Sequence, residues 1–224
     1  MACIESRRFF PHRMRMSGKT RNRILVASLL LFNEHGEPGT TTNEIADEVD
    51  ISPGNLHYHF RKKVQVVDAL LDEFQADAKR VLRPPPDDVV TIDDFWVFLH
   101  LLLECTAAYR FLFRDLETLG DSYPRVAQVM GRFAKGLAAV FELYLRQLAS
   151  TGLLVIDDDN AAILARNLAV IALFSPRFDG LTGQVLSADD SALRVAGSIL
   201  NALKPITADG AVEHIEELAA HYDS

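Results

Sequence analysis

The 224-residue sequence has only two cysteines and lacks the features that mark secreted and membrane proteins. Cys3 and Cys105, the latter inside an apolar helical pattern, imply neither a disulfide framework nor a metal site. The most apolar stretches, such as residues 24–32 and 95–103, are much shorter than the roughly 20 residues that cross a bilayer. The first residues contain arginines but no apolar signal-peptide core. We therefore expect a soluble cytoplasmic protein without a membrane partner.

The sequence motifs of common enzymes are also missing. There is no Gly-x-Ser-x-Gly, no His-Glu-x-x-His, no paired Glu-x-x-His and no glycine-rich phosphate loop. We therefore expect no catalytic activity, no cofactor and no metal.

The charge of the chain is unevenly distributed. The composition, 49% hydrophobic and 24% charged, is that of a globular protein, and the net charge is −8. Residues 1–64 nevertheless contain 10 lysines and arginines against 7 acidic residues, whereas residues 65–224 contain 13 against 24. Because salt screens distant charges, a mildly basic N-terminal part can still bind nucleic acid.

Three short helices are predicted near the N-terminus. Apolar residues recur at three- and four-residue steps over residues 24–32 and stop before Gly36. Thr41 and Glu44 have the spacing of a capping box, which places the start of a second helix at about Thr42. Ser52 is a suitable N-cap for a third helix of about two turns, with Pro53 in its first turn.

The rest of the chain has helical patterns separated by breaks. A fourth helix starts at about Lys62 and stops at the triple proline of residues 84–86. Further patterns lie at about residues 91–113, 123–151, 159–175, 188–203 and 210–221. The single strand-like run, residues 153–156, has no evident partner.

These patterns predict an all-α fold of about nine or ten helices, in which a three-helix helix-turn-helix domain precedes a larger helical bundle. The predicted divisions are a flexible tail (1–18), a helix-turn-helix domain (19–65), a connecting helix (66–86) and a larger helical domain (87–224).

Residues 41–63, TTNEIADEVDISPGNLHYHFRKK, suit a helix-turn-helix. Ala46 is small where the two helices would cross, and five apolar residues are expected to fix their angle: Ile45, Val49, Ile51, Leu56 and Phe60. The residues left exposed on the second helix are Pro53, Gly54, Asn55, His57, Tyr58 and His59. The alternative for the two histidines is a core-edge role or a metal site, but residues two apart on a helix point in different directions.

The string IADEVDISPGNLHYHFRKK resembles the signature of the TetR family of regulators, and the resemblance extends over about residues 19–70. It implies that Thr41 or Thr42 and the adjacent backbone N–H groups hold a phosphate, as does Lys63. It also implies that three residues approach base edges: Pro53, Gly54 and Asn55. His57 stands where the family commonly has tyrosine, so the usual tyrosine–phosphate contact falls to His57 or Tyr58, whereas His59 and Phe60 are expected to be structural.

The N-terminal tail has two interpretations. Four arginines, at positions 7, 8, 13 and 15, could form an arm along DNA. Alternatively, Met14 and Met16 lie just before SGKTRNRIL, which resembles a family start, so part of the tail could result from a wrongly assigned upstream start.

Most aromatic residues lie after residue 90, and helical spacing explains most of them as core. A ligand cavity is also possible in such a bundle. We expect it near five residues, for each of which packing is the alternative: Trp96, His100, Tyr123, Phe133 and Phe174.

The segment YRFLFRDL (109–116) resembles a branch of the TetR family associated with polyhydroxyalkanoate storage, which implies a hydrophobic, acyl-type effector. Arg110 and Arg114 could meet a carboxylate or phosphate of the effector, or form an ion pair with Asp115 or Glu117.

The resemblance further implies that residues 19–65 bind DNA and that residues 87–224 are an effector-binding and dimerisation domain. The homodimer would form through the last two long helices, Asn160–Phe174 and Asp189–Leu203, and bind a palindromic operator. We expect a one-component repressor that responds to a small molecule. The alternative is an activator or architectural DNA-binding protein without an effector.

Overall fold

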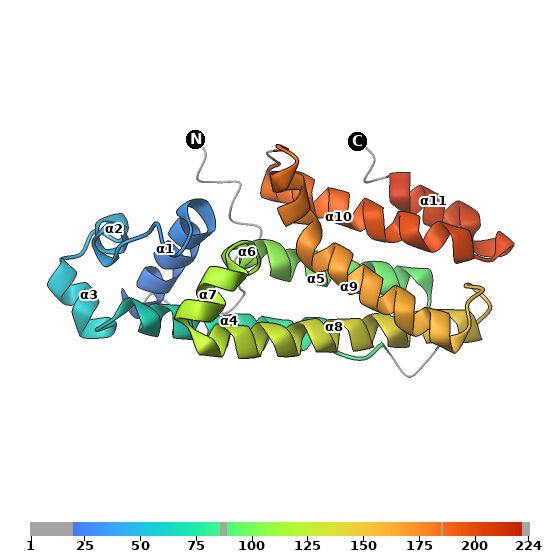
Figure 1. Cartoon of the computed structure of the whole chain (residues 1–224), viewed down its shortest axis with the longest axis horizontal. Helices are drawn as coiled ribbons and strands as arrows, with labels where there is room; N and C mark the ends of the chain where they lie inside the picture. Colours follow the sequence, from blue (N-terminus) through green and yellow to red (C-terminus); the bar gives the residue numbers. More distant parts are fainter. Residues whose placement is uncertain (1–19, 86–88, 185, 221–224) are drawn as a thin grey trace. The chain divides into compact units, whose positions relative to one another are not determined.

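The computed structural model describes residues 20–85, 89–184 and 186–220 (Figure 1). The tail 1–18 and its arginines lie outside these ranges. The described residues form eleven α-helices: α1 (Thr20–His35), α2 (Thr42–Glu48), α3 (Pro53–His59), α4 (Lys63–Val81), α5 (Ile92–Ala108), α6 (Arg110–Arg114), α7 (Leu116–Ser122), α8 (Pro124–Ser150), α9 (Asp158–Leu181), α10 (Ala188–Leu203) and α11 (Val212–Ala220). Two short 3-10 helices, η3 (Lys204–Ile206) and η4 (Asp209–Ala211), lie between α10 and α11. The predicted all-α class is confirmed.

The local capping patterns predicted for α2 and α3 are confirmed. The Glu44 backbone N–H donates to Thr41 Oγ1 at 3.2 Å, and the Thr41 N–H donates to Glu44 Oε2 at 2.6 Å. Ser52 caps α3 by accepting from the Asn55 N–H at 3.2 Å, and Pro53 occupies the first turn. Caps of this kind satisfy backbone donors that have no partner inside the helix.

Contacts divide the described chain into two compact units. Residues up to Ala78, together with Ala108–Met130, form the N-terminal unit. Lys79–Ala107 and the residues from Gly131 onward form the C-terminal unit. This division differs from the contiguous 19–65, 66–86 and 87–224 division predicted from sequence, since residues 108–130 group with the N-terminal helices.

The C-terminal boundary predicted for the helix at residues 91–113 is wrong. α5 ends at Ala108, and α6 and α7 follow as separate short helices after Tyr109 and Asp115. Neither break contains glycine or proline. At the first break, the buried Asn33 side chain donates to Ala108 O at 2.8 Å and accepts from the Phe111 N–H at 3.0 Å. Contacts between residues distant in the sequence therefore accompany this break.

An aromatic cluster between α5 and α8 forms part of the core of the C-terminal unit. The Phe98 ring stacks on Tyr144 with centroids 4.9 Å apart, and Phe95 packs against Phe141 at 6.1 Å. The sequence suggested no partner for residues 153–156, but the structure provides one. Leu154 forms an antiparallel bridge with Thr207, and the Val155 N–H donates to Ile206 O at 2.7 Å.

α9 extends beyond its predicted end. It continues through Pro176 to Leu181, although proline lacks the N–H of a helical hydrogen bond. By length and composition it is the one helix of the described ranges that could cross a membrane, and one third of its most apolar window is buried. The sequence alone predicts no apolar stretch of this length.

Candidate DNA-binding interface

The N-terminal half of α3 has one buried side and one exposed side. Leu56 is fully buried, whereas Pro53, Gly54 and Asn55 are exposed. A Cβ built on Gly54 would have only Ser52 Oγ within 4 Å, at 3.9 Å, so packing does not require glycine at this position. The exposed side therefore presents one amide side chain beside two residues that leave the backbone accessible.

Two aromatic residues extend this exposed surface toward the end of α3. Tyr58 is 83% exposed, the largest exposure among the large hydrophobic and aromatic side chains of the described residues. His57 is also exposed, and the half-buried His59 ring lies edge-on to Tyr58 at 5.3 Å. Within the described ranges, no group of three or more His, Cys, Asp or Glu residues could hold a metal ion.

The start of α2 is already engaged by its own capping box. The hydroxyl and the backbone N–H of Thr41 both donate to the Glu44 carboxylate, at 2.9 and 2.6 Å. These hydrogen bonds lower the pKa of Glu44. Thr42, the other predicted phosphate contact, is the first residue of α2 and is half-buried.

Lys63, also predicted to hold a phosphate, is paired within the protein. Its Nζ lies 3.0 Å from Oε1 of Glu37, a residue that is 4% exposed, and donates to the Glu37 carbonyl at 2.5 Å. The same Nζ lies 5.8 Å from the centroid of the Phe32 ring. Sequence reasoning missed Glu37 because an acidic residue in a turn looks solvent-exposed.

Tyr123, predicted to line the ligand pocket, instead contacts Glu37 in the N-terminal unit. Its hydroxyl donates to Glu37 Oε1 at 2.5 Å. Burial, followed by this hydrogen bond and the carboxylate charge, raises the pKa of Tyr123 well above its ordinary range. Four residues contribute to this site of the N-terminal unit: Phe32, Glu37, Lys63 and Tyr123.

Arg110 and Arg114, for which the sequence left two roles open, cap the C-terminal end of α1. The Arg110 Nε donates to Asn33 O at 3.0 Å, and Arg114 donates to Asn33 O and Phe32 O, both at 3.1 Å. Arg114 also forms an ion pair with Asp115 at 2.9 Å, which was one of the two alternatives. Both guanidinium groups therefore make contacts inside the N-terminal unit.

The other four predicted ligand-pocket residues lie in the C-terminal unit. Trp96 and His100 are brought together, with ring centroids 3.9 Å apart. Among the described residues, no hydrogen-bond partner reaches the buried Trp96 Nε1. Phe133 is buried, whereas Phe174 is 42% exposed. Of the five residues, Trp96 and His100 are therefore in contact, and Tyr123 belongs to the N-terminal unit.

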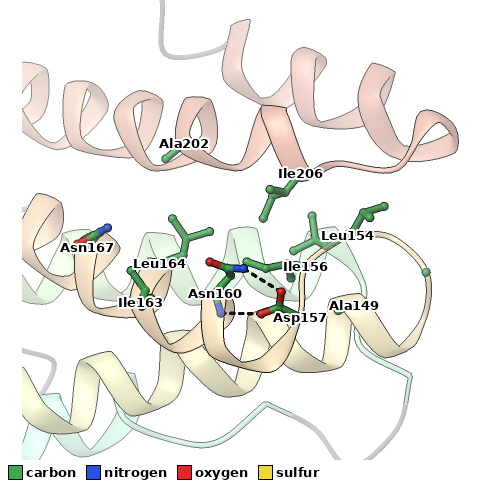
Figure 2. A pocket seen from close by; sticks show the side chains of 12 residues that line it. Ala149, Leu154, Ile156, Asp157, Asn160, Ile163, Leu164, Asn167, Ala202 and Ile206 are labelled. Atoms are coloured by element: carbon green, nitrogen blue, oxygen red, sulfur yellow. Dashed lines mark hydrogen bonds between the residues drawn. The ribbon is translucent and has the colours of Figure 1, made fainter.

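A groove of about 750 Å³ lies elsewhere in the C-terminal unit (Figure 2). Ile163, Leu164 and Asn167 of α9 line one side, and Ala202 and Ile206 line the other. At its end, Asp157 caps α9 by accepting from the Asn160 N–H at 2.8 Å. None of the five predicted ligand residues lines this groove.

An apolar stripe runs along the exposed side of α9. Its members are separated by three, four or seven residues, so they lie on one side of the helix: Ile163, Val170, Phe174, Phe178 and Leu181. Their exposed fractions range from 42% to 81%. Ile163 belongs to both the stripe and the groove.

Comparisons with known proteins identify relatives of both parts of the chain. Residues 24–70 match "Bacterial regulatory proteins, tetR family", and residues 73–215 match "Bacterial transcriptional repressor". The probable HTH-type transcriptional regulator YttP of Bacillus subtilis is 22% identical over 139 residues, which cover 59% of this chain and 66% of that protein. UidR of Escherichia coli, an HTH-type transcriptional regulator, is 28% identical over 111 residues, covering 50% and 57% respectively.

The structural likeness extends over most of the chain. A TetR-family transcriptional regulator from Marinobacter aquaeolei has a TM-score of 0.82 and 29% identity, covering 92% of this chain and 100% of that one. Salmonella enterica GusR, with a TM-score of 0.55 and 24% identity, shares the fold. The match to the repressor family spans more than half of the chain. The chain therefore belongs to the TetR family of transcriptional regulators.

Proposed function

We propose that the chain is a one-component cytoplasmic repressor that binds palindromic operator DNA as a homodimer and responds to a small hydrophobic molecule. The observation that carries the DNA-binding proposal is the exposed surface of a capped α3. A helix that follows a tight turn and presents its N-terminal residues outward suits insertion into a major groove.

Within this surface, each residue has a role suited to its chemistry. The Asn55 amide can donate to and accept from an adenine edge, while Pro53 and Gly54 allow the backbone to approach the bases. His57 and Tyr58 suit phosphate contacts. At α2, the capping box occupies Thr41, so we assign the phosphate contact there to Thr42 and the adjacent backbone N–H groups.

A second copy of the chain suits the stripe on α9. Five large apolar side chains exposed on one helix are costly in water and are typical of an interface. A two-fold axis crossing the stripe would let each α9 cover the other, with the groove of Figure 2 at the edge of the interface. The predicted close-packing helices 160–174 and 189–203 fall within α9 and α10.

For the effector we keep a hydrophobic, acyl-type molecule as the proposal. The aromatic interior of the C-terminal unit and the unpartnered Trp96 Nε1 beside His100 suit an apolar ligand with one acceptor oxygen. Binding would lower operator affinity by favouring a second conformation.

Selection of bound sequences from a random DNA library tests the DNA-binding proposal. We expect a palindrome with half-sites about one helical turn apart. Recovery of no enriched sequence would reject specific DNA binding. Titration of the protein–operator complex with acyl chains of increasing length then separates a sensor from an effector-independent regulator. If the protein binds the ligand and its operator affinity does not change, coupling between ligand and DNA binding is rejected.

A further inference from the structure

The buried carboxylate of Glu37 organises three segments of the N-terminal unit. It lies in the turn between α1 and α2 and is 4% exposed. One of its oxygens accepts from the Tyr123 hydroxyl at 2.5 Å and lies 3.0 Å from Lys63 Nζ. A buried carboxylate that loses its cation keeps its desolvation cost without compensation, so separating Lys63 from Glu37 is energetically unfavourable.

The ammonium group of Lys63 is surrounded by protein groups. It donates a hydrogen bond to the Glu37 carbonyl and forms an ion pair with the Glu37 carboxylate, with 3.0 Å between Nζ and Oε1. The Phe32 ring lies 5.8 Å away, within the range of a cation–π contact, and the side chain is 24% exposed. To reach a DNA phosphate, Lys63 would have to break its ion pair with Glu37 and leave a buried carboxylate without a cation.

The placement of the pair in the chain indicates what it does. Glu37 lies just before α2, and Lys63 is the first residue of α4, three residues after the C-cap of α3 at Phe60. Their contact therefore joins the two ends of the segment that contains the helix-turn-helix. Tyr123, the C-cap residue of α7, connects this contact to residues 108–130.

We propose that Lys63 is a positioning residue and not a phosphate contact. With Glu37 and Tyr123 it forms a clasp, called here the Glu37 clasp, that fixes the angle at which α3 is presented. Phosphates at this edge are then contacted by Arg61 and Lys62, which are both exposed. The inference rests on the proposed function, since it assumes that α3 enters DNA.

The test compares how operator affinity depends on salt in matched variants. Anisotropy titrations of the selected operator at several salt concentrations give the slope of log K against log[salt], which changes by about 0.9 for each phosphate contact removed. For Lys63→Met we expect an affinity loss of about tenfold, or 1.4 kcal/mol, at every salt concentration with the wild-type slope. For Lys62→Met, the control with the same chemistry, we expect a slope reduced by about 0.9 per protomer.

For Glu37→Gln, the clasp and a phosphate-binding role of Lys63 predict opposite changes in operator affinity. If Lys63 held a phosphate, this variant would release the ammonium group, and affinity and slope would both increase. The clasp predicts lower affinity, and it predicts that the double variant Glu37→Gln/Lys63→Met loses no more than the worse single variant. An affinity gain for Glu37→Gln, or a reduced slope for Lys63→Met, would overturn the inference.

Thermal unfolding gives a readout that does not need DNA. The clasp predicts that both single variants lower Tm and that the double variant lowers it by less than the two decreases combined; additive decreases would count against it. If Lys63→Met does not fold, Glu37→Gln, which preserves shape and acceptor oxygen, provides the test. Failure of the wild-type protein to bind DNA would reject the proposed function. The affinities, salt slopes and Tm values of the Glu37 and Lys63 variants test the clasp.

Discussion

The hydroxyl of Tyr123 donates a 2.5 Å hydrogen bond to the carboxylate of Glu37, 86 residues earlier in the chain. Tyr123→Phe removes only the hydroxyl, so the variant leaves a buried acceptor with one donor fewer. We expect the free energy of unfolding at pH 7 to fall by about 1–2 kcal/mol. Calorimetric or chemical unfolding of the two proteins measures this difference, and an unchanged stability would contradict the contribution of the bond.

The same hydrogen bond has a predicted pH dependence. Burial and Glu37 raise the pKa of Tyr123 in the folded state above the ordinary value of 10.0. A group whose pKa is raised on folding stabilises fully below its unfolded pKa and loses this contribution as pH rises above it. The stability difference between wild type and Tyr123→Phe should therefore be constant from pH 7 to about 9 and shrink above pH 10. A difference that grows with pH would contradict the sign.

Gly36 and Gly131 should respond oppositely to alanine. Gly36 has φ +86°, and a Cβ there would lie 3.1 Å from Arg114 Nη2 and 3.2 Å from Asp115 Oδ2. Gly131 is an exposed residue within α8 with nothing within 4 Å of a built Cβ. We expect Gly36→Ala to destabilise by about 1–2 kcal/mol and Gly131→Ala to stabilise by about 0.5–1 kcal/mol.

Thermal denaturation monitored by circular dichroism measures both glycine variants. For a chain of this size, 1 kcal/mol corresponds to a Tm change of about 2–4 °C. A Tm that does not fall for Gly36→Ala would show that the turn at Gly36 tolerates a side chain.

Val170 and Val97 provide a matched test of the α9 interface. They are the same residue type with nearly the same exposure, 50% on α9 and 51% on α5. We expect Val170→Asp to shift the protein toward monomer, because a charge would be buried in the interface, and Val97→Asp to retain the wild-type mass. Sedimentation velocity over a range of concentrations measures this. A dimer that withstands Val170→Asp but dissociates with Val97→Asp would place the interface on α5.

Asn55→Ala tests base recognition by α3. Because the amide can bond an adenine edge in two places, its removal should cost about 1–3 kcal/mol of discrimination at one base position. Competition titrations with operators changed at single positions measure the loss. Gln128→Ala, which removes an exposed amide on α8, is the control and should bind as wild type. Equal weakening of operator and random DNA by Asn55→Ala would reject the base-reading role.

The features that could be predicted from the sequence are those determined by neighbours along the chain. The capping pair Thr41–Glu44, the N-cap Ser52 and the contact of Trp96 with His100 all join residues three or four apart. A helix places such residues side by side regardless of the rest of the fold.

The features that could not be predicted join distant segments. Asn33 meets Phe111 across 78 residues, and Lys63 meets Glu37 across 26. Position in a motif indicated that Lys63 was free to bind a phosphate, because no local pattern reveals a buried carboxylate beside it. The aromatic ring of Tyr123 likewise suggests either a ligand pocket or core packing, because no local pattern reveals the distant carboxylate to which its hydroxyl donates.

The grouping of residues 108–130 with the N-terminal helices affects how this regulator can be divided or recombined. A fragment cut after Ala78 would lose the arginines that cap α1 and the tyrosine that meets Glu37. It would also uncover Phe32 and Phe74, whose rings pack against Phe111 and Tyr109. Chimeric regulators that give this DNA specificity to another sensor should therefore exchange both stretches together, and natural recombination at the proline-rich segment alone would produce mismatched partners.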